Sequence, residues 1–132
     1  MARTYTSALG LQELDGSTKF ANEKGNFECV ALVQQTAKAP HTSTWVQGKR
    51  VMDCAPGEIA LGTVIATFDE TGKYPLTQRH AAIYENHDAT GINVVDQWNS
   101  QAMAKRRKIR LKNLPARDIN DAKWYYIVQT EV

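Results

Sequence analysis

The sequence predicts a small α+β protein in which N-terminal helices pack on one face of an antiparallel sheet. Two observations carry this prediction. The first forty residues contain two apolar segments whose spacing or composition is typical of helices. From residue 61 onward, short runs of β-branched and aromatic residues alternate with turn residues. Such runs are typical of strands that follow one another in an antiparallel sheet.

The bulk properties indicate one globular domain. The 132 residues fit a single domain, residues 1–132, and 42% are hydrophobic against 23% charged, which excludes a disordered chain. The longest apolar run, Cys29–Val33, is too short to cross a membrane. The N-terminus lacks the apolar stretch of a Sec signal peptide. We therefore expect synthesis in the cytoplasm, no membrane partner and no export by the Sec route.

Two helices are expected before residue 40. Residues Ser7–Leu14 have apolar residues at helical spacing and end at the turn Asp15-Gly16. A second helix is predicted over Cys29–Lys38, because Pro40 ends it and its first two turns are apolar on nearly all sides. A helix that is apolar all round is buried. We expect it to reach a surface cleft at its N-terminal end, where Cys29 lies.

Strands fill the remainder of the predicted fold. Residues Leu61–Phe68 are rich in β-branched side chains. Two further runs are joined by the polar segment Asn86–Gly91, whose Asn, Asp and Gly residues suit a reversal of the chain. Together the predicted strands form an antiparallel meander over residues 61–68, 80–85, 92–98, 108–112 and 125–130.

Cys29 is a candidate nucleophile because of its place at the start of a helix. The thiolate is the reactive form of cysteine, and a helix N-terminus lowers the pKa of a thiol through its free N–H groups and its dipole. The same N–H groups can bind the oxyanion of a tetrahedral intermediate. Taken alone, a helical cysteine is more often a core residue.

A His-Asp pair on the predicted hairpin strengthens the case for Cys29. If Tyr84 pairs with Ile92 across the loop, His80 lies directly opposite Asp96 on the same face of the sheet. Directly opposed residues have Cβ atoms roughly 4.5–5.5 Å apart, so the Asp96 carboxylate can accept the Nδ1–H of His80. The other ring nitrogen is then free to take the thiol proton. A slip of one residue would separate the pair.

Other reactive side chains are interpreted as structural. Cys54 is read as a structural thiol, and His41 and His87 as solvated side chains at a helix end and in a hairpin loop. The histidines and cysteines lack the short paired spacings of zinc modules, so we expect no metal and no other cofactor. Trp98 shares the face of Asp96 and either lines the substrate groove or packs in the core.

The basic residues are unevenly distributed. Segment 104–123 holds eight of the sixteen Lys and Arg residues, opposed there by two aspartates. Such a segment either faces an anionic polymer, such as nucleic acid or cell wall, or forms a solvated strand edge. Aromatic residues do not interleave with the basic ones as in a single-strand binding platform, which makes nucleic acid the less favoured partner.

The motifs together resemble a known family. The chain is similar to the CHAP and NlpC-like cysteine amidases, and more narrowly to small type VI secretion amidase effectors, over about residues 20–112. The motifs that carry this resemblance are Cys29-Val-Ala-Leu-Val-Gln, Thr44-Trp-Val-Gln-Gly, Gly62-Thr-Val-Ile-Ala-Thr-Phe, His80-Ala-Ala-Ile-Tyr and Gly91-Ile-Asn-Val-Val-Asp-Gln-Trp.

The resemblance implies a fold, a reaction and a set of residues. It implies a papain-like fold and hydrolysis of a peptide bond in the stem peptide or cross-link of bacterial peptidoglycan. It maps the nucleophile to Cys29, the base to His80 and the third residue to Asp96, and it leaves Gln97 and Asn99 open as alternatives to Asp96. The residue before the cysteine is Glu28, and the glutamine that papain-like enzymes use in the oxyanion hole is missing there. The Cys29 backbone N–H is then the expected donor.

The resemblance also implies a biological setting. An effector injected by a type VI secretion apparatus acts in the periplasm of a target cell and needs no Sec signal. A cognate immunity protein protects the cell that makes it. The alternative from a different class is a non-catalytic module that binds cell wall or nucleic acid through residues 104–123.

Overall fold

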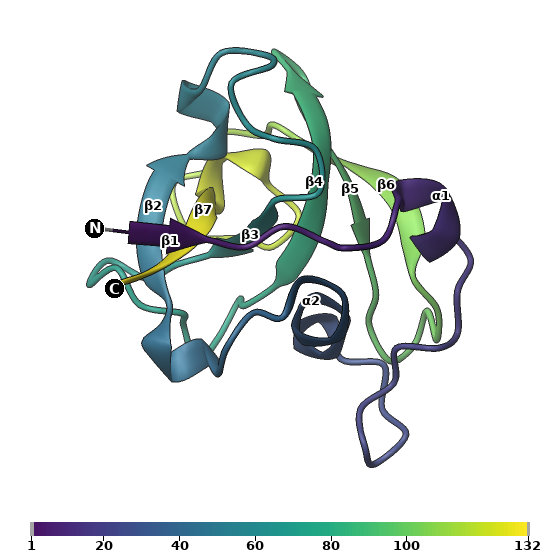
Figure 1. Cartoon of the computed structure of the whole chain (residues 1–132). Coiled ribbons are helices and arrows are strands. Elements are labelled where there is room, and N and C mark those ends of the chain that lie inside the picture. The colour runs from purple at the N-terminus through teal and green to yellow at the C-terminus, as the bar shows by residue number, and fades with distance from the viewer. Residues whose placement is uncertain (1, 132) are drawn as a thin grey trace.

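A computed structural model describes residues 2–131 and shows a mixed fold built on one mostly antiparallel sheet (Figure 1). The strands are β1 (Ala2–Thr4), β2 (Val46–Arg50), β3 (Val64–Thr67), β4 (Ala81–Asp88), β5 (Gly91–Asp96), β6 (Lys105–Arg110) and β7 (Tyr125–Glu131). The helices are α1 (Leu11–Leu14) and α2 (Cys29–Ala37), with 3-10 turns η1 (Thr42–Thr44), η2 (Val51–Asp53) and η3 (Ala122–Trp124).

The strand order is β1-β7-β3-β4-β5-β6, and β2 also pairs with β7. The meander from β3 to β6 agrees with the prediction. The last strand departs from it, because β7 returns to the other side of β3 instead of extending the sheet beyond β6. The strands β1 and β2 were not predicted. Both are short and largely polar, β2 contains Gly48, and neither shows the apolar alternation of a half-buried strand.

Two hydrophobic cores cover the two faces of the sheet. Ala81 and Ile83 of β4 belong to one core together with Leu32 of α2, while the alternate residues Ala82 and Tyr84 belong to the other. The second core is closed by η2 and the segment after it, through Val51, Cys54 and Ile59, and by Ala122 of η3. The sheet is therefore buried on both faces, with α2 on one and irregular chain on the other.

Helix α2 begins at Cys29, as predicted, and packs against β4, with its axis nearly along the line of sight in Figure 1. It ends because Lys38 adopts the left-handed conformation and Pro40 follows. The predicted helix over residues 7–14 shrinks to the single turn α1, since the Ser7 hydroxyl bonds the backbone of Leu9 and holds that segment in a turn. Neither α1 nor α2, within residues 2–131, is long and apolar enough to cross a membrane.

The predicted β4–β5 hairpin is correct in its strands but wrong in its register. Tyr84 pairs with Val94 instead of Ile92, and after a bulge His87 pairs with Ile92. The segment predicted as a loop continues β4 as far as Asp88, because Asn86 bonds Asn93 across the strands and His87 is buried. The shift is two residues, so the alternation of faces is kept and His80 and Asp96 still share a side.

A tight approach of the backbone explains Gly91 at the start of β5. Its φ is 154°, and a Cβ there would stand 2.3 Å from the Ile109 carbonyl oxygen of β6. We expect Gly91→Ala to lower the free energy of unfolding by about 2–4 kcal/mol, because two paired strands would have to separate. Urea denaturation followed by tryptophan fluorescence measures it.

The control for this prediction is Gly10→Ala. At Gly10 a Cβ meets the Glu13 carboxylate oxygen at 3.6 Å, which is ordinary contact, and the residue only begins α1. We expect a loss below about 1 kcal/mol there. Equal losses for the two variants would contradict the role assigned to the close approach at Gly91.

Candidate active site

Contacts from the end of β5 fix the chain that leads into α2. Gln97 donates from Nε2 to the carbonyl oxygens of Phe20 and Glu28, each at 2.9 Å. The Asn99 side chain accepts a hydrogen bond of 2.7 Å from the Phe27 N–H. Both amides therefore hold the segment that ends at Cys29, and within residues 2–131 neither bonds His80.

His80 and Asp96 form a buried pair. The Nε2 atom of His80 lies 2.7 Å from Oδ2 of Asp96, with the two residues 5% and 0% exposed. The prediction that Nδ1 would face the carboxylate was wrong. In the observed register Asp96 lies diagonally across from His80, a separation that the distal Nε2 can span. Because a carboxylate can only accept, Nε2 carries a proton, and in the neutral imidazole Nδ1 is then the acceptor.

The thiol of Cys29 interacts with His80 and is partly exposed. Burial by itself would raise the pKa of the thiol, but hydrogen bonding and charge attraction from His80 outweigh it and lower that pKa. Burial likewise opposes the charged imidazole, yet Asp96 and Cys29 raise the pKa of His80 to about 9. The arrangement therefore favours a thiolate–imidazolium pair.

Tyr74 is a further neighbour of the thiol that the sequence interpretation missed. Its hydroxyl oxygen lies 3.8 Å from Cys29 Sγ, and its ring packs edge-on against Trp45 with the centroids 4.9 Å apart. Burial and the neighbouring Cys29 raise the pKa of Tyr74, so its hydroxyl stays protonated. Tyr74 lies in a loop outside the regular strands, and its spacing from Cys29 and His80 gave no signal.

Arg107 of β6 was also missed as a site residue. Its Nε donates to Asp96 Oδ2 at 2.7 Å, and its guanidinium lies 5.1 Å from the centroid of the Trp98 ring. Trp98 in turn meets the His80 ring edge-on at 6.4 Å between centroids. In the sequence Arg107 was one of a run of basic residues, with nothing to distinguish it from its neighbours.

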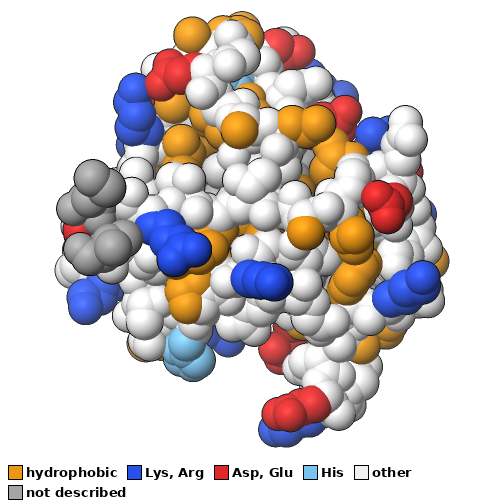
Figure 2. Space-filling model, viewed as in Figure 1, with side chains coloured by type: hydrophobic (Ala, Val, Ile, Leu, Met, Phe, Trp, Pro, Cys, Tyr) orange, Lys and Arg blue, Asp and Glu red, His pale blue; other side chains and the backbone are white. Residues whose placement is uncertain are grey.

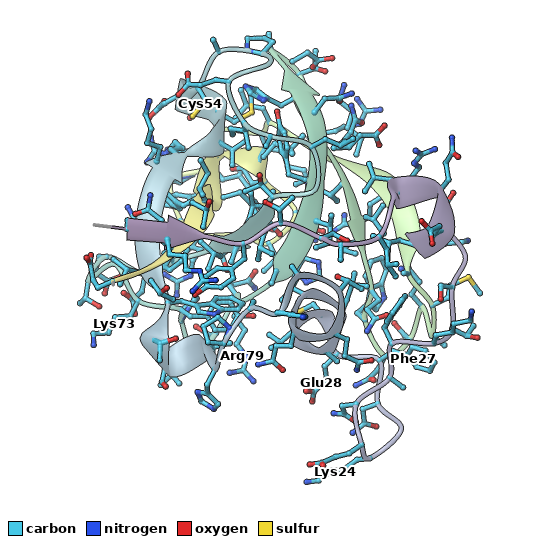
Figure 3. All side chains as sticks on the ribbon, viewed as in Figure 1. Lys24, Phe27, Glu28, Cys54, Lys73 and Arg79 are labelled. Atoms are coloured by element: carbon cyan, nitrogen blue, oxygen red, sulfur yellow. The ribbon has the colours of Figure 1, made fainter. Side chains whose placement is uncertain are left out.

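A pocket of about 610 Å³ opens onto Cys29 and His80. Tyr74 and Trp98, which is 37% exposed, line it, and charged side chains at its edge include Glu28 and Arg79. These two come from the segment before α2 and the segment before β4, and Figure 3 shows both labelled side chains near the end of the molecule where the loop of Lys24 extends. The pocket can therefore receive an extended polar chain over the thiol.

The remaining histidines and cysteine lie outside the reactive group. His41 is exposed, as predicted, and lines the same pocket. His87 was predicted to be solvated, but it is 7% exposed, because its two ring nitrogens bond the Tyr84 hydroxyl at 2.6 Å and the Cys54 carbonyl at 2.8 Å. Cys54 is buried beneath η2. Among residues 2–131, no three His, Cys, Asp or Glu side chains converge as metal ligands would.

Comparisons with known proteins find similarity to amidase effectors. A type VI secretion amidase effector 2 protein of Salmonella typhi is 34% identical, over 98% of this chain and 100% of its own length. The domesticated amidase effector 2 of Ixodes scapularis is 40% identical, over 76% of this chain and 70% of its own. A solved structure of type 6 secretion amidase effector 2 superimposes with a TM-score of 0.79 at 32% identity, covering 96% of this chain and 95% of that one.

The family comparison covers nearly the whole chain. Residues 4–128 match the family described as domesticated amidase effector 2. That range contains the helix with Cys29, both strands of the hairpin and Arg107 of β6. The resemblance to small type VI secretion amidase effectors that the motifs indicated is thereby confirmed. The chain belongs to the domesticated amidase effector 2 family.

Proposed function

We propose that this chain is a cysteine amidase or endopeptidase that hydrolyses a peptide bond in the stem peptide or cross-link of bacterial peptidoglycan. The observation that carries the proposal is that Cys29 and His80 meet at one pocket, while the buried Asp96 bonds His80, and the thiol and the imidazole shift each other's pKa. Family membership supports amidase activity. The peptide of the cell wall is the extended, polar amide polymer that such a pocket would take.

The proposed reaction proceeds through a thioester. His80 holds the thiol proton on Nδ1, and the Cys29 thiolate attacks the scissile carbonyl. The imidazolium gives its proton to the leaving amine, and the C–N bond breaks. Neutral His80 then takes a proton from water, whose oxygen attacks the thioester; the C–S bond breaks, and the product acid leaves with the thiolate–imidazolium pair restored. Asp96 keeps the imidazole in the tautomer with the proton on Nε2 throughout.

The first turn of α2 would bind the oxyanion. The Glu28 side chain makes no capping hydrogen bond to α2, so within the described chain the first N–H groups of the helix keep no side-chain acceptor. The Cys29 N–H is therefore the main-chain donor we propose. The Tyr74 hydroxyl, a protonated donor close to Sγ, is the side chain we propose for the other half of the hole.

We propose further that the fold is papain-like in the manner of the CHAP and NlpC amidases, with the chain forming one catalytic domain over residues 1–132. The order of the parts supports this proposal. Cys29 opens helix α2, His80 directly precedes strand β4, and Asp96 ends strand β5. Trp98 at the pocket edge would contact substrate.

Delivery by type VI secretion is part of the same proposal. One relative is a type VI secretion effector of almost equal length, which supports export from the producing cell by that apparatus and action in the periplasm of a target cell. Such a toxin requires a cognate immunity protein, which would be this chain's protein partner.

The basic segment gives less support to a polyanion-binding module. Of the five Lys and Arg residues in β6, three have carboxylate partners, at 3.6 Å for Arg106 with Glu85, 2.7 Å for Arg107 with Asp96 and 3.3 Å for Lys108 with Asp88. On the face shown in Figure 2, Lys and Arg side chains are scattered, and some lie beside Asp or Glu side chains. Binding to a polyanion needs a concentrated positive surface.

Muropeptide analysis tests the proposed activity. Purified protein incubated with Gram-negative peptidoglycan is expected to convert specific cross-linked or peptide-bearing species, which chromatography and mass spectrometry identify. Cys29→Ala and His80→Ala should lower the rate by about 10³-fold or more, because the nucleophile and its base act as a unit. Cys54→Ala should keep it. An unchanged muropeptide profile with folded, reduced wild-type protein would exclude this substrate.

The ion pair gives the expected pH dependence. It exists above the lowered pKa of Cys29 and below about 9, the pKa of His80. Alkylation of Cys29 by iodoacetamide should therefore persist below the pH at which ordinary thiols react, and hydrolysis should decline as His80 loses its proton above about pH 9. A single alkylation midpoint at the ordinary thiol pKa would contradict the pairing. Cys54→Ala serves as the background, so that one thiol is observed.

Removal of the Tyr74 hydroxyl tests the oxyanion assignment. Tyr74→Phe keeps the ring against Trp45 but deletes the donor. We expect kcat to fall about ten- to a hundredfold with little change in KM, since an oxyanion donor acts in the transition state. The alkylation midpoint of Cys29 should rise only slightly, because the Tyr74 hydrogen bond is the smallest of the causes that lower the pKa of the thiol. An unchanged kcat would leave the hole to the main chain alone.

A further inference from the structure

The Asp96 carboxylate lies in a place where its charge is costly. It is 0% exposed, and its Oδ2 atom accepts both the 2.7 Å bond from His80 Nε2 and the 2.7 Å bond from Arg107 Nε. Its Oδ1 atom is buried and has no hydrogen-bond partner within residues 2–131. A buried carboxylate with so few donors favours its neutral form unless a positive charge stands next to it.

His80 cannot supply that charge throughout the proposed reaction. In the resting state the imidazolium is positive, but in the thioester state the histidine is neutral and must act as a base. If His80 were the sole partner, the negative charge of the buried carboxylate would have no positive neighbour at that stage. A carboxylate that is not held in place would no longer fix the Nε2–H tautomer that keeps Nδ1 as the base.

We propose that Arg107 is a positioning residue that balances the buried charge of Asp96 and holds its carboxylate on His80 Nε2 while His80 gains and loses its proton. This inference rests on the proposed function of the Cys29 site. With Arg107 present, the group formed by Cys29, His80, Asp96 and Arg107 sums to zero charge both as thiolate with imidazolium and as thioester with neutral imidazole. Without Arg107, one negative charge would remain buried in either state.

Arg107 also constrains the aromatic ring that covers the histidine. Its guanidinium lies 5.1 Å from the Trp98 ring centroid, and Trp98 packs edge-on against the His80 ring. Trp98, Arg107 and His80 line one cavity of about 400 Å³ beside the Cys29 pocket. The Arg107 side chain thus contacts both neighbours of His80, the Asp96 carboxylate and the Trp98 ring.

The other charged and titratable groups around the pair do not replace Arg107. Tyr74 and the fully buried Tyr125 have raised pKa values and stay neutral, so they add no charge. Arg79 interacts with the Tyr74 ring at 6.0 Å on the Cys29 side of the pocket. Lys105 is the residue of β6 directly paired with Asp96, but its side chain is exposed.

The test uses the pH profile of Cys29 alkylation by iodoacetamide, in full-length protein carrying Cys54→Ala. We expect Arg107→Gln to raise the midpoint by about one pH unit or more, which lowers the alkylation rate near pH 7 by about tenfold. Arg107→Lys keeps a positive charge and should restore most of the wild-type profile. Lys105→Gln removes the same charge from the same strand and should leave the midpoint in place.

A double-mutant cycle shows whether Arg107 acts through Asp96. In an Asp96→Asn background there is no carboxylate charge to balance or to hold in place, so Arg107→Gln should no longer raise the midpoint. The same upward shift in both backgrounds would overturn the proposal. So would a midpoint that Arg107→Gln leaves unchanged in protein whose circular dichroism and thermal unfolding match wild type.

Kinetics on peptidoglycan separate positioning from substrate binding. A positioning role predicts that Arg107→Gln lowers kcat and narrows its pH profile with KM nearly unchanged. A rise in KM with kcat and the alkylation profile unchanged would overturn the proposal and make Arg107 a substrate contact. The alkylation measurement needs no substrate. If wild type left peptidoglycan intact but the Arg107 effects on Cys29 appeared, the proposed function would fail while the linkage of Arg107, Asp96 and Cys29 would stand.

Discussion

The pairing of β4 with β5 is the contact on which the site depends. It brings the residue before β4 and the last residue of β5 close enough for a 2.7 Å bond between His80 and Asp96. The same β4 supports α2 on one face of the sheet, which fixes where the helix begins relative to the histidine. Residues directly after β5 then hold the segment that enters α2. One hairpin therefore carries His80 and Asp96 and also helps to position the thiol of Cys29.

The pairing register of β4 and β5 shows how much of this site the sequence could predict. The hydrophobic alternation of β4 and β5 fixed which residues share a face, and this sufficed to bring His80 and Asp96 together. It could not fix the pairing itself, because Asn86 and Asp88 are turn formers by type, and the contacts of Asn86 with Asn93 and of the buried His87 with Cys54 keep the segment in the strand. Because the register differs from the predicted one, Nε2 of His80 and not Nδ1 contacts Asp96. Tyr74 and Arg107 were missed because their partners lie far away in sequence.

The fold outside the hairpin shows the same limit. The core strands and α2 are predicted by local patterns. Apolar runs indicate these elements, and Pro40 indicates where the helix ends. The pattern of β7 alone does not say which edge of the sheet it joins; it pairs with the fully buried β3 and not with the basic, largely exposed β6. The basic run of β6 likewise allowed two interpretations from sequence, a surface that faces an anionic polymer or a solvated strand edge. Its contacts divide it, since Arg107 pairs with the buried Asp96 carboxylate while Lys105 and Arg110 remain exposed.

The two cysteines lie in different cores. Cys29 packs against the core that contains α2, and Cys54 belongs to the core on the other face of the sheet. A disulfide needs Cα atoms within about 7 Å, and a whole layer of paired strands separates these two. The folded chain therefore has no internal means of capping Cys29, the proposed nucleophile, by oxidation. In an oxidising compartment, Cys29 would remain a thiol until an external oxidant or a second molecule reached it.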